Sequence, residues 1–240
     1  MRTYFITLFI IIMICPLHGQ IVTIEYGPTY YPPQFKTKMH PDIVGTRVAN
    51  DNYFYKVQYS QLINERILLS GSYSQYPVST FFRFHNENGS GGSGWNGVDV
   101  CRLDLIFTYN IFEKSRFILQ PNFGLGIQKS ISQDVGIIGG DIPYGIKPDN
   151  FELLKDIEAF AYSNSQLVPI FGLKFGYAFW SRLELFFDIQ QVFGHKIIQE
   201  LRMSYTYKGV EQPEAISYSD GTGRFFALGI GYRFVKQKVK

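Results

Sequence analysis

The chain has 240 residues, which suits one domain, and a formal net charge of only +3. Charged residues make up 18% and aromatic residues 17% of it, yet the mean hydropathy is −0.05. Many large apolar rings are therefore present without long apolar runs, which excludes a bundle of membrane-spanning helices, since each such helix needs about 18 or more apolar residues. The small net charge also argues against a nucleic-acid partner.

Residues 1–19 are expected to be a signal peptide. Arg2 supplies a positive charge, residues 4–14 are apolar except for Thr7, and the small Gly19 stands at the predicted cleavage edge. The apolar stretch is too short to span a bilayer, which disfavours a membrane anchor. The domain is expected to cover residues 20–235, and residues 236–240 form a short basic tail.

Residues 224–234 show the clearest strand pattern. One set of alternate positions is wholly large and apolar: Phe226, Leu228, Ile230, Tyr232 and Phe234. The positions between them are mostly small: Phe225, Ala227, Gly229, Gly231 and Arg233. Successive side chains of a strand point to opposite faces, so this pattern predicts one apolar face and one crowded face. A narrow barrel has such a crowded interior.

The same alternation recurs along the chain. The other predicted strands are residues 22–27, 53–60, 66–84, 102–109, 116–128, 171–179 and 183–190. Short connections at residues 63–65, 112–115 and 180–182 alternate with long ones at 31–51, 85–97, 130–165 and 209–223. This alternation is typical of barrels with tight periplasmic turns and long external loops. The predicted fold is all-β: an eight-stranded antiparallel up-and-down transmembrane β-barrel.

One external loop is expected to contain a short helix at residues 148–160. Asp149 or Asn150 would cap its first turn. The apolar residues at helical spacing are Phe151, Leu154, Ile157 and Phe160. Such a helix would cover the barrel rim, lie at the membrane surface or contact a partner.

The glycine-rich strands carry a resemblance to known proteins. The segments concerned are residues 226–234 (FALGIGYRF), 123–126 (FGLG) and 171–177 (FGLKFGY). They resemble the small OmpA-like outer-membrane barrels of the Bacteroidota type, and more distantly the PorT-like barrels. In that family a final strand ending in an aromatic residue is the assembly signal read by the barrel-insertion machinery. The resemblance assigns this role to Tyr232 and Phe234, although six residues follow Phe234.

The polar residues on the predicted inner face are expected to form a network inside the barrel. They are Glu25, Lys56, Arg102, Asp104, Arg116, Lys174, Glu184, Asp188 and Arg233. Five are basic and four are acidic. A selective pore usually shows one dominant sign of charge, whereas near balance favours ion pairs that fill the lumen. A path for protons or small ions is the alternative.

The sequence predicts no catalytic residue, no cofactor and no metal. Lipid A deacylases of this shape have a serine two residues after a histidine, but Ile197 follows His195 at that spacing. Glu200 and Ser204 are close in sequence, and His40 and His85 lie in long loops without a defined partner. A soluble lipocalin-like barrel is disfavoured, because its outer face would then display mostly glycine and alanine.

The expected function is that of a non-enzymatic barrel in the bacterial outer membrane. It would act in membrane structure or in surface interaction through its external loops. Two alternatives stay open: an accessory component of an outer-membrane secretion or assembly complex, and a lipid A-modifying barrel enzyme. The expected partners are outer-membrane lipid, the barrel-insertion machinery during biogenesis and a protein at the external loops.

Overall fold

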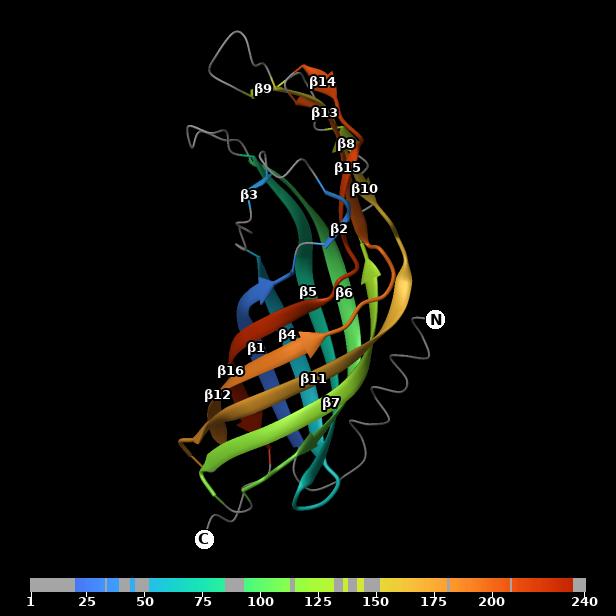
Figure 1. Ribbon diagram of the computed structural model, residues 1–240. Helices are drawn as coiled ribbons and strands as arrows, with labels where there is room; N and C mark the ends of the chain where they lie inside the picture. Colours follow the sequence, from blue (N-terminus) through green and yellow to red (C-terminus); the bar gives the residue numbers. More distant parts are fainter. Residues whose placement is uncertain are drawn as a thin grey trace.

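Eight strands of the chain close into one antiparallel barrel (Figure 1). The computed structural model describes residues 20–32, 34–38, 44–45, 52–84, 93–112, 115–131, 136–137, 142–144, 152–180, 182–207 and 209–234. The barrel strands are β1 (Gln20–Tyr30), β4 (Tyr53–Leu62), β5 (Ile67–Phe84), β6 (Ser93–Tyr109), β7 (Phe117–Ser130), β11 (Ser165–Ala178), β12 (Leu183–Val192) and β16 (Gly223–Arg233). Each pairs with the next, and β16 pairs with β1 to close the ring. The predicted fold is confirmed.

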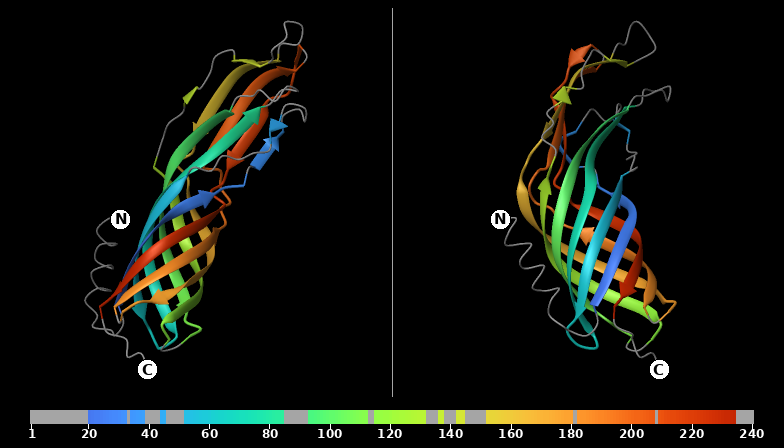
Figure 2. Two further views of the ribbon diagram at one scale, coloured as in Figure 1. Left: turned by 90° about the vertical axis from the view of Figure 1, so that its left-hand side faces the viewer. Right: turned by 180° about the vertical axis from the view of Figure 1, so that it is seen from behind.

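The connections alternate in length as predicted. Residues 63–66, 110–116 and 179–182 join strands at the end of the barrel where β1 begins and β16 ends (Figure 2). The long connections all leave the opposite end, where a second sheet rises above the barrel (Figure 2). In outer-membrane barrels the short turns face the periplasm. We call the two ends of the barrel the turn end and the loop end.

The side chains alternate as the pattern of residues 224–234 indicates. Leu228 is 65% exposed and Ile230 is 58% exposed on the outside, whereas Phe225 and Ala227 are buried inside. Large apolar residues also cover the outside of the other barrel strands, among them Ile24, Leu105, Phe123 and Phe171. Water would penalise such an exterior, but the hydrocarbon of a bilayer would not. Among the described residues, no helix is long and apolar enough to cross a membrane.

The second sheet is built from the long connections. It runs in the order β2 (Gln34–Thr37), β15 (Ala215–Ser219), β13 (Gln199–Tyr207), β10 (Glu152–Ala161) and β8 (Gly136–Ile137). Two short strands join it at its far end, β9 (Ile142–Tyr144) on β10 and β14 (Val210–Glu211) on β13. β13 and β15 lie against the extended upper part of β5, which also pairs with β3 (Val44–Gly45). We call this layer the external sheet.

The predicted helix at residues 148–160 is wrong. Its described part belongs to strand β10, which pairs with β13, and residues 148–151 lie outside the described residues. A register shift between Leu154 and Asp156 inserts one extra residue. Leu154 and Ile157, three apart, therefore pair with positions two apart on β13. The spacing that looked helical belongs to a strand with a bulge.

Two loop boundaries also differ from the prediction. The last long connection covers residues 193–222 and not 209–223, because β13 precedes the predicted start. β6 begins at Ser93, inside the connection predicted for residues 85–97. The predicted signal peptide and the basic tail lie outside the described residues.

Candidate functional site: a filled lumen and an external sheet

Lys56 is the centre of a charged layer inside the barrel. Its ammonium nitrogen lies 2.5 Å from Glu25 Oε2 and 3.1 Å from Asp188 Oδ2. Lys174 approaches the other oxygen of Glu25 at 3.5 Å. The register produces the first of these contacts, since Glu25 is directly opposite Lys56, whereas Asp188 and Lys174, directly opposite each other on β12 and β11, reach this pair across the lumen. Each buried charge therefore has an opposite partner, without which its burial would be costly.

Arg102 forms a second charged layer, nearer the loop end. Its Nε lies 2.7 Å from Asp104 Oδ1, and one terminal nitrogen lies 3.4 Å from the amide oxygen of Gln190. The side chain of Gln190 in turn donates to Asp188, which links the two layers. The guanidinium also lies over the ring of Phe225, 4.9 Å from its centroid. This contact joins the charged layers to the apolar rings beyond them.

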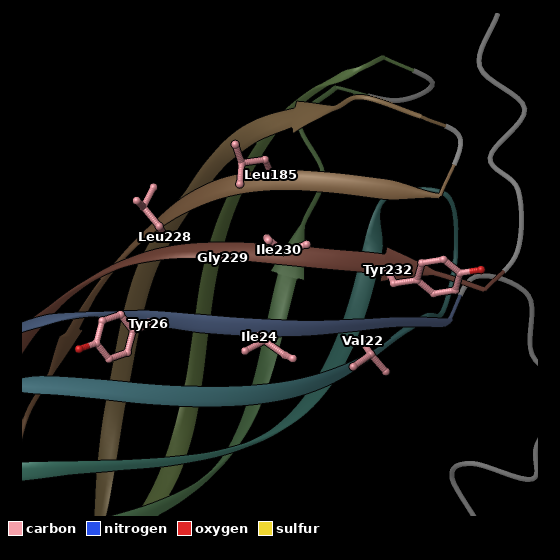
Figure 3. A pocket seen from close by; sticks show the side chains of 8 residues that line it. All are labelled: Val22, Ile24, Tyr26, Leu185, Leu228, Gly229, Ile230 and Tyr232. Carbon is pink, nitrogen blue, oxygen red and sulfur yellow. The ribbon is translucent and has the colours of Figure 1, made fainter.

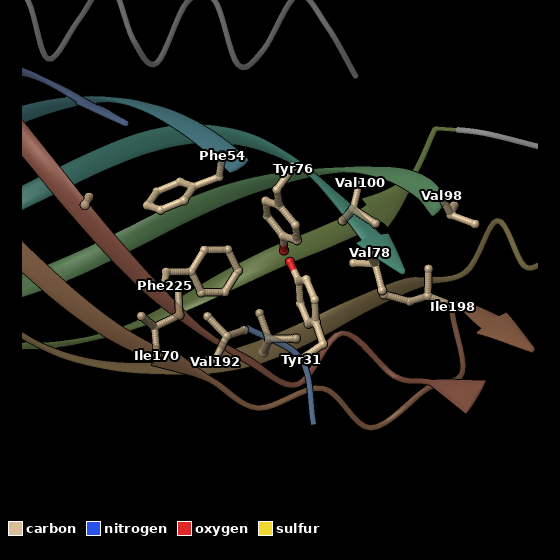
Figure 4. Packing of buried hydrophobic residues seen from close by; sticks show 12 residues of the cluster. Tyr31, Phe54, Tyr76, Val78, Val98, Val100, Ile170, Val192, Ile198 and Phe225 are labelled. Carbon is tan, nitrogen blue, oxygen red and sulfur yellow. The ribbon is translucent and has the colours of Figure 1, made fainter. Parts of the chain in front are cut away.

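An apolar cluster fills the loop end of the lumen (Figure 4). The ring of Phe225 meets those of Tyr76 and Phe54 edge to face, with centroids 4.9 and 5.1 Å apart. The other labelled members are Tyr31, Val78, Val98, Val100, Ile170, Val192 and Ile198. Every member is at most 3% exposed. The interior is therefore closely packed at this level, and the sequence pattern did not predict the cluster.

Small residues make room for the charged side chains. A Cβ built on Gly229 would lie 2.3 Å from the ring of Phe186 and 2.9 Å from Cγ of Glu25. One built on Gly231 would lie 2.6 Å from Cγ of Glu184. On the predicted crowded face of β16, glycines therefore leave the space that large side chains of β1 and β12 occupy.

The structure places eight of the nine predicted lumen residues on the inner face. Glu184 pairs with Arg233 at 3.2 Å, near the turn end. Arg116 is the exception, because it precedes the first residue of β7 and its side chain is exposed. The eight inward residues are four bases and four acids, so their charges balance. Arg102 pairs with Asp104, and not with Glu184 or Asp188, which its charge alone would also allow.

The connection between β12 and β16 is tied across the barrel mouth. The amide nitrogen of Gln166 donates to the carbonyl of Asp220 at 2.7 Å. Its amide oxygen accepts from the backbone of His195 and Lys196, both at 2.8 Å. These bonds hold both ends of residues 193–222 against β11. The external sheet is therefore attached to the barrel at a fixed position.

Glu200 organises the outer face of the external sheet. Its carboxylate accepts from Lys36 of β2 at 2.5 Å and from Arg202 at 2.7 Å. The two cations also lie over aromatic rings, Lys36 over Tyr218 and Arg202 over Phe160. Burial acts to raise the pKa of the Glu200 carboxyl, but the hydrogen bonds from Lys36 and Arg202 outweigh it and lower that pKa. We call these five residues the external patch.

The opposite face of the external sheet is buried. Leu201 and Met203 of β13 and Ala215 of β15 are at most 1% exposed, and both strands lie against β5. The alternation along β13 therefore separates a packed face from the external patch. On the face that carries the external patch, the side chains of Lys36 and Arg202 are 44% and 39% exposed, whereas Glu200 beneath them is buried.

The candidate catalytic residues do not form a site. The carboxylate of Glu200 is bound to Lys36 and Arg202, and Ser204 lies opposite Asp156 on β10. His195 is exposed, and its backbone is held by Gln166. His40 and His85 lie outside the described residues. Among the residues described, no group of three or more His, Cys, Asp and Glu side chains could hold a metal ion.

The outside of β16 carries a shallow apolar groove (Figure 3). Its volume is about 490 Å³. The lining residues are Val22, Ile24, Tyr26, Leu185, Leu228, Gly229, Ile230 and Tyr232. Tyr232 and Phe234, the predicted assembly signal, are exposed at the turn end, with ring centroids 5.3 Å apart.

A closed barrel with an apolar exterior satisfies all its backbone hydrogen bonds internally and can face hydrocarbon. The molecule is a membrane-spanning barrel of the outer-membrane type. No family model and no curated protein matches the chain.

Several solved structures resemble it at low identity. The outer membrane protein OprG from Pseudomonas aeruginosa has a TM-score of 0.48 and 10% identity, covering 91% of this chain and 97% of that one. Ail, the attachment invasion locus protein of Yersinia pestis, has a TM-score of 0.43 and 10% identity, covering 91% and 99%. The N-terminal β-barrel domain of P. aeruginosa OprF has a TM-score of 0.41 and 10% identity, covering 91% and 98%. Similarity at this level assigns no function to this chain.

Proposed function

We propose that the protein is a non-enzymatic outer-membrane barrel that acts in membrane structure or surface interaction through its external sheet. The observation that supports this most is the contrast between the two halves of the molecule. The lumen is filled by paired charges and a buried apolar cluster. The long connections, in contrast, fold into an ordered layer that is tied to the barrel mouth. The external half is thus the part offered to a partner.

The external patch has the chemistry of a protein contact surface. Aromatic residues and arginine are enriched in protein interfaces, and Phe160, Tyr218 and Arg202 stand side by side here across three paired strands. The ion pairs with Glu200 hold Lys36 and Arg202 in place before any partner binds. A preorganised surface loses less conformational entropy on binding. The partner we propose is therefore a protein at the cell surface.

The direct test is to remove part of the external sheet without disturbing the barrel. Lys129 and Ser165 are directly opposite each other on β7 and β11. Residues 131–163 can therefore be replaced by a short turn that closes a hairpin. We expect the replacement to leave a barrel whose gel mobility still shifts on boiling, and to abolish co-purification of a partner after mild detergent extraction. Partner binding that survives the replacement would place the function elsewhere.

Two point variants refine this test. The variant Arg202→Ala/Tyr218→Ala should weaken partner binding, whereas Arg224→Ala, an exposed arginine on the barrel wall, should not. Co-purification of several outer-membrane proteins together would favour the accessory role in a secretion or assembly complex. A change in lipid A mass on deletion of the gene, reversed by the wild type but not by His195→Ala, would favour the enzyme instead.

A further inference from the structure

One arrangement of arginine and tyrosine is repeated at all three short turns. Each turn ends with an exposed arginine, and the residue after it pairs with a tyrosine near the end of a neighbouring strand. The pairs are Ile67 with Tyr109, Phe117 with Tyr177, and Leu183 with Tyr232. The arginines that precede them are Arg66, Arg116 and Arg182. The same register thus places an arginine beside a tyrosine three times around the turn end.

The backbone contacts repeat as well. In each unit the arginine carbonyl accepts from the residue after the tyrosine, at 2.7 Å: from Asn110, Ala178 and Arg233 in turn. In two units the guanidinium also donates to the tyrosine hydroxyl at 3.0 Å, from Arg66 to Tyr109 and from Arg182 to Tyr232. Tyr109 and Tyr232 are 42% and 39% exposed. These units present a guanidinium and a phenol at the edge of the apolar exterior.

The unit of Arg182 and Tyr232 adjoins the apolar groove. Figure 3 shows Tyr232 and Val22 at one end of the groove and Tyr26 at the other, with Ile24 and Ile230 between them. The register explains the hollow, because Ile230 lies between Ile24 on β1 and Leu185 on β12. Aliphatic side chains in the middle and tyrosines at the ends leave a trough along β16.

The trough covers most of the depth of one lipid leaflet. The four steps from Leu228 to Tyr232 rise about 13 Å along the strand at about 3.3 Å per residue, which is about 10 Å along the membrane normal at a strand tilt of about 40°. Half of an apolar band of about 25 Å is close to this value. An acyl chain lying in the trough would bring its headgroup to Arg182. The guanidinium fork matches the oxygens of a phosphate, and tyrosine is favoured at the interface between headgroups and hydrocarbon.

We propose that Arg182, Tyr232 and the groove over β12, β16 and β1 form a binding site for one glycerophospholipid of the periplasmic leaflet. The phosphodiester contacts the guanidinium of Arg182, and one acyl chain fills the groove. This inference rests on the proposed membrane setting, but not on the external sheet or its partner. Arg66 and Tyr109 form the matched unit at another position of the turn end.

The test uses the full barrel in detergent and two photoreactive lipids with identical diazirine-bearing acyl chains. One lipid is a phosphatidylglycerol, and the other is a galactolipid without phosphate. We expect phosphatidylglycerol to cross-link mainly to the peptides of β1, β12 and β16. Arg182→Gln should weaken its binding about fivefold, the effect of removing one basic residue near an anionic surface. Arg66→Gln should leave cross-linking in the groove unchanged.

A second variant tests the acyl chain. Ile24→Phe should fill the trough and reduce cross-linking by both lipids, with Leu105→Phe on the exterior of β6 as control. Labelling spread evenly around the barrel, or equal labelling by the galactolipid, would overturn the site. So would equal losses for Arg182→Gln and Arg66→Gln. A shift in gel mobility on boiling shows that each variant is folded, so loss of this site is distinguishable from failure of the barrel or of the external contact.

Discussion

Gly229 shows how closely the lumen is packed at a single position. Its absent side chain leaves the space that the ring of Phe186 and the stem of Glu25 occupy. Gly229→Ala should therefore destabilise the barrel by about 1–3 kcal/mol, the usual cost of overpacking. Urea unfolding in lipid vesicles measures it. Gly71→Ala is the control, since nothing lies within 4 Å of a Cβ there, and an equal loss for both variants would contradict the packing argument.

Lys56 is the residue on which the charged layer depends most. Lys56→Met would remove the nearest partner of both Glu25 and Asp188, which are buried. Breaking a buried ion pair in this way costs about 3–5 kcal/mol, and we expect a loss of that size in the free energy of unfolding.

Two further variants check this expectation. Adding Asp188→Asn to Lys56→Met should recover much of the stability, because Glu25 then keeps Lys174 as its partner and no buried charge is left unpaired. Lys129→Met, at an exposed lysine, should have little effect. If this double variant is no more stable than Lys56→Met alone, the ion pairs are not what the substitution disturbs.

Residue types and the alternation along each strand predicted which side chains face inward, but not which side chains they contact. Alternation along each strand places Glu25 and Lys56 inside, whereas their contact depends on the register between β1 and β4. Arg116 was wrongly assigned to the inner face, because the alternation was extended to the residue before β7 begins. The apolar cluster has only a weak signal in sequence, namely Phe225 at an otherwise small position of β16. Its other members come from strands far apart in the chain.

At the scale of the element, β2 is attached to the external sheet through a titratable group. The pKa of Glu200 is lowered below its ordinary value of 4.5 by Lys36 and Arg202, although burial opposes this. The ion pairs therefore stabilise the sheet fully above pH 4.5, and this contribution is lost as the pH falls through the lowered pKa. We expect β2 of the wild type to be more protected than β2 of Glu200→Gln at pH 6.

That difference should disappear at low pH. Hydrogen exchange of the β2 peptide, corrected for the intrinsic exchange rate at each pH, measures it. The lumen-facing strand β4 is the internal reference, because it does not contact Glu200. Protection that differs between wild type and variant by the same amount at both pH values would show that Glu200 acts through packing and not through charge.

The strand β10 shows where sequence patterns stop being sufficient. Apolar residues three apart are typical of a helix, but a bulge gives the same spacing in a strand. The strand conformation is decided by β13, which supplies the backbone partners of β10 from 38 to 51 residues away. The barrel strands were predictable because one periodic pattern decides both their conformation and their face. The external strands lack such a repeated pattern.

At the scale of the whole molecule, the layers inside the barrel predict that it does not conduct ions. Eight strands enclose a space that side chains fill, and here paired charges and the apolar cluster fill it. Planar-bilayer recordings of the purified protein should show no stable single-channel steps. The same result is expected after replacement of residues 131–163, because the cluster belongs largely to barrel strands. Reproducible ion-selective conductance in the wild type would contradict this account of the lumen.

The pairing of β1 with β16 has a consequence for how the protein is made. Ile21 and Arg233, more than 200 residues apart, are register partners. Until β16 is in place, β1 and β12 each present an unsatisfied edge, and contacts between such distant positions form slowly. A chain cut short by a stalled ribosome or a periplasmic protease could not close the ring. Only a chain that contains β16 can therefore close the barrel, and incomplete copies keep open strand edges that expose them to aggregation or degradation.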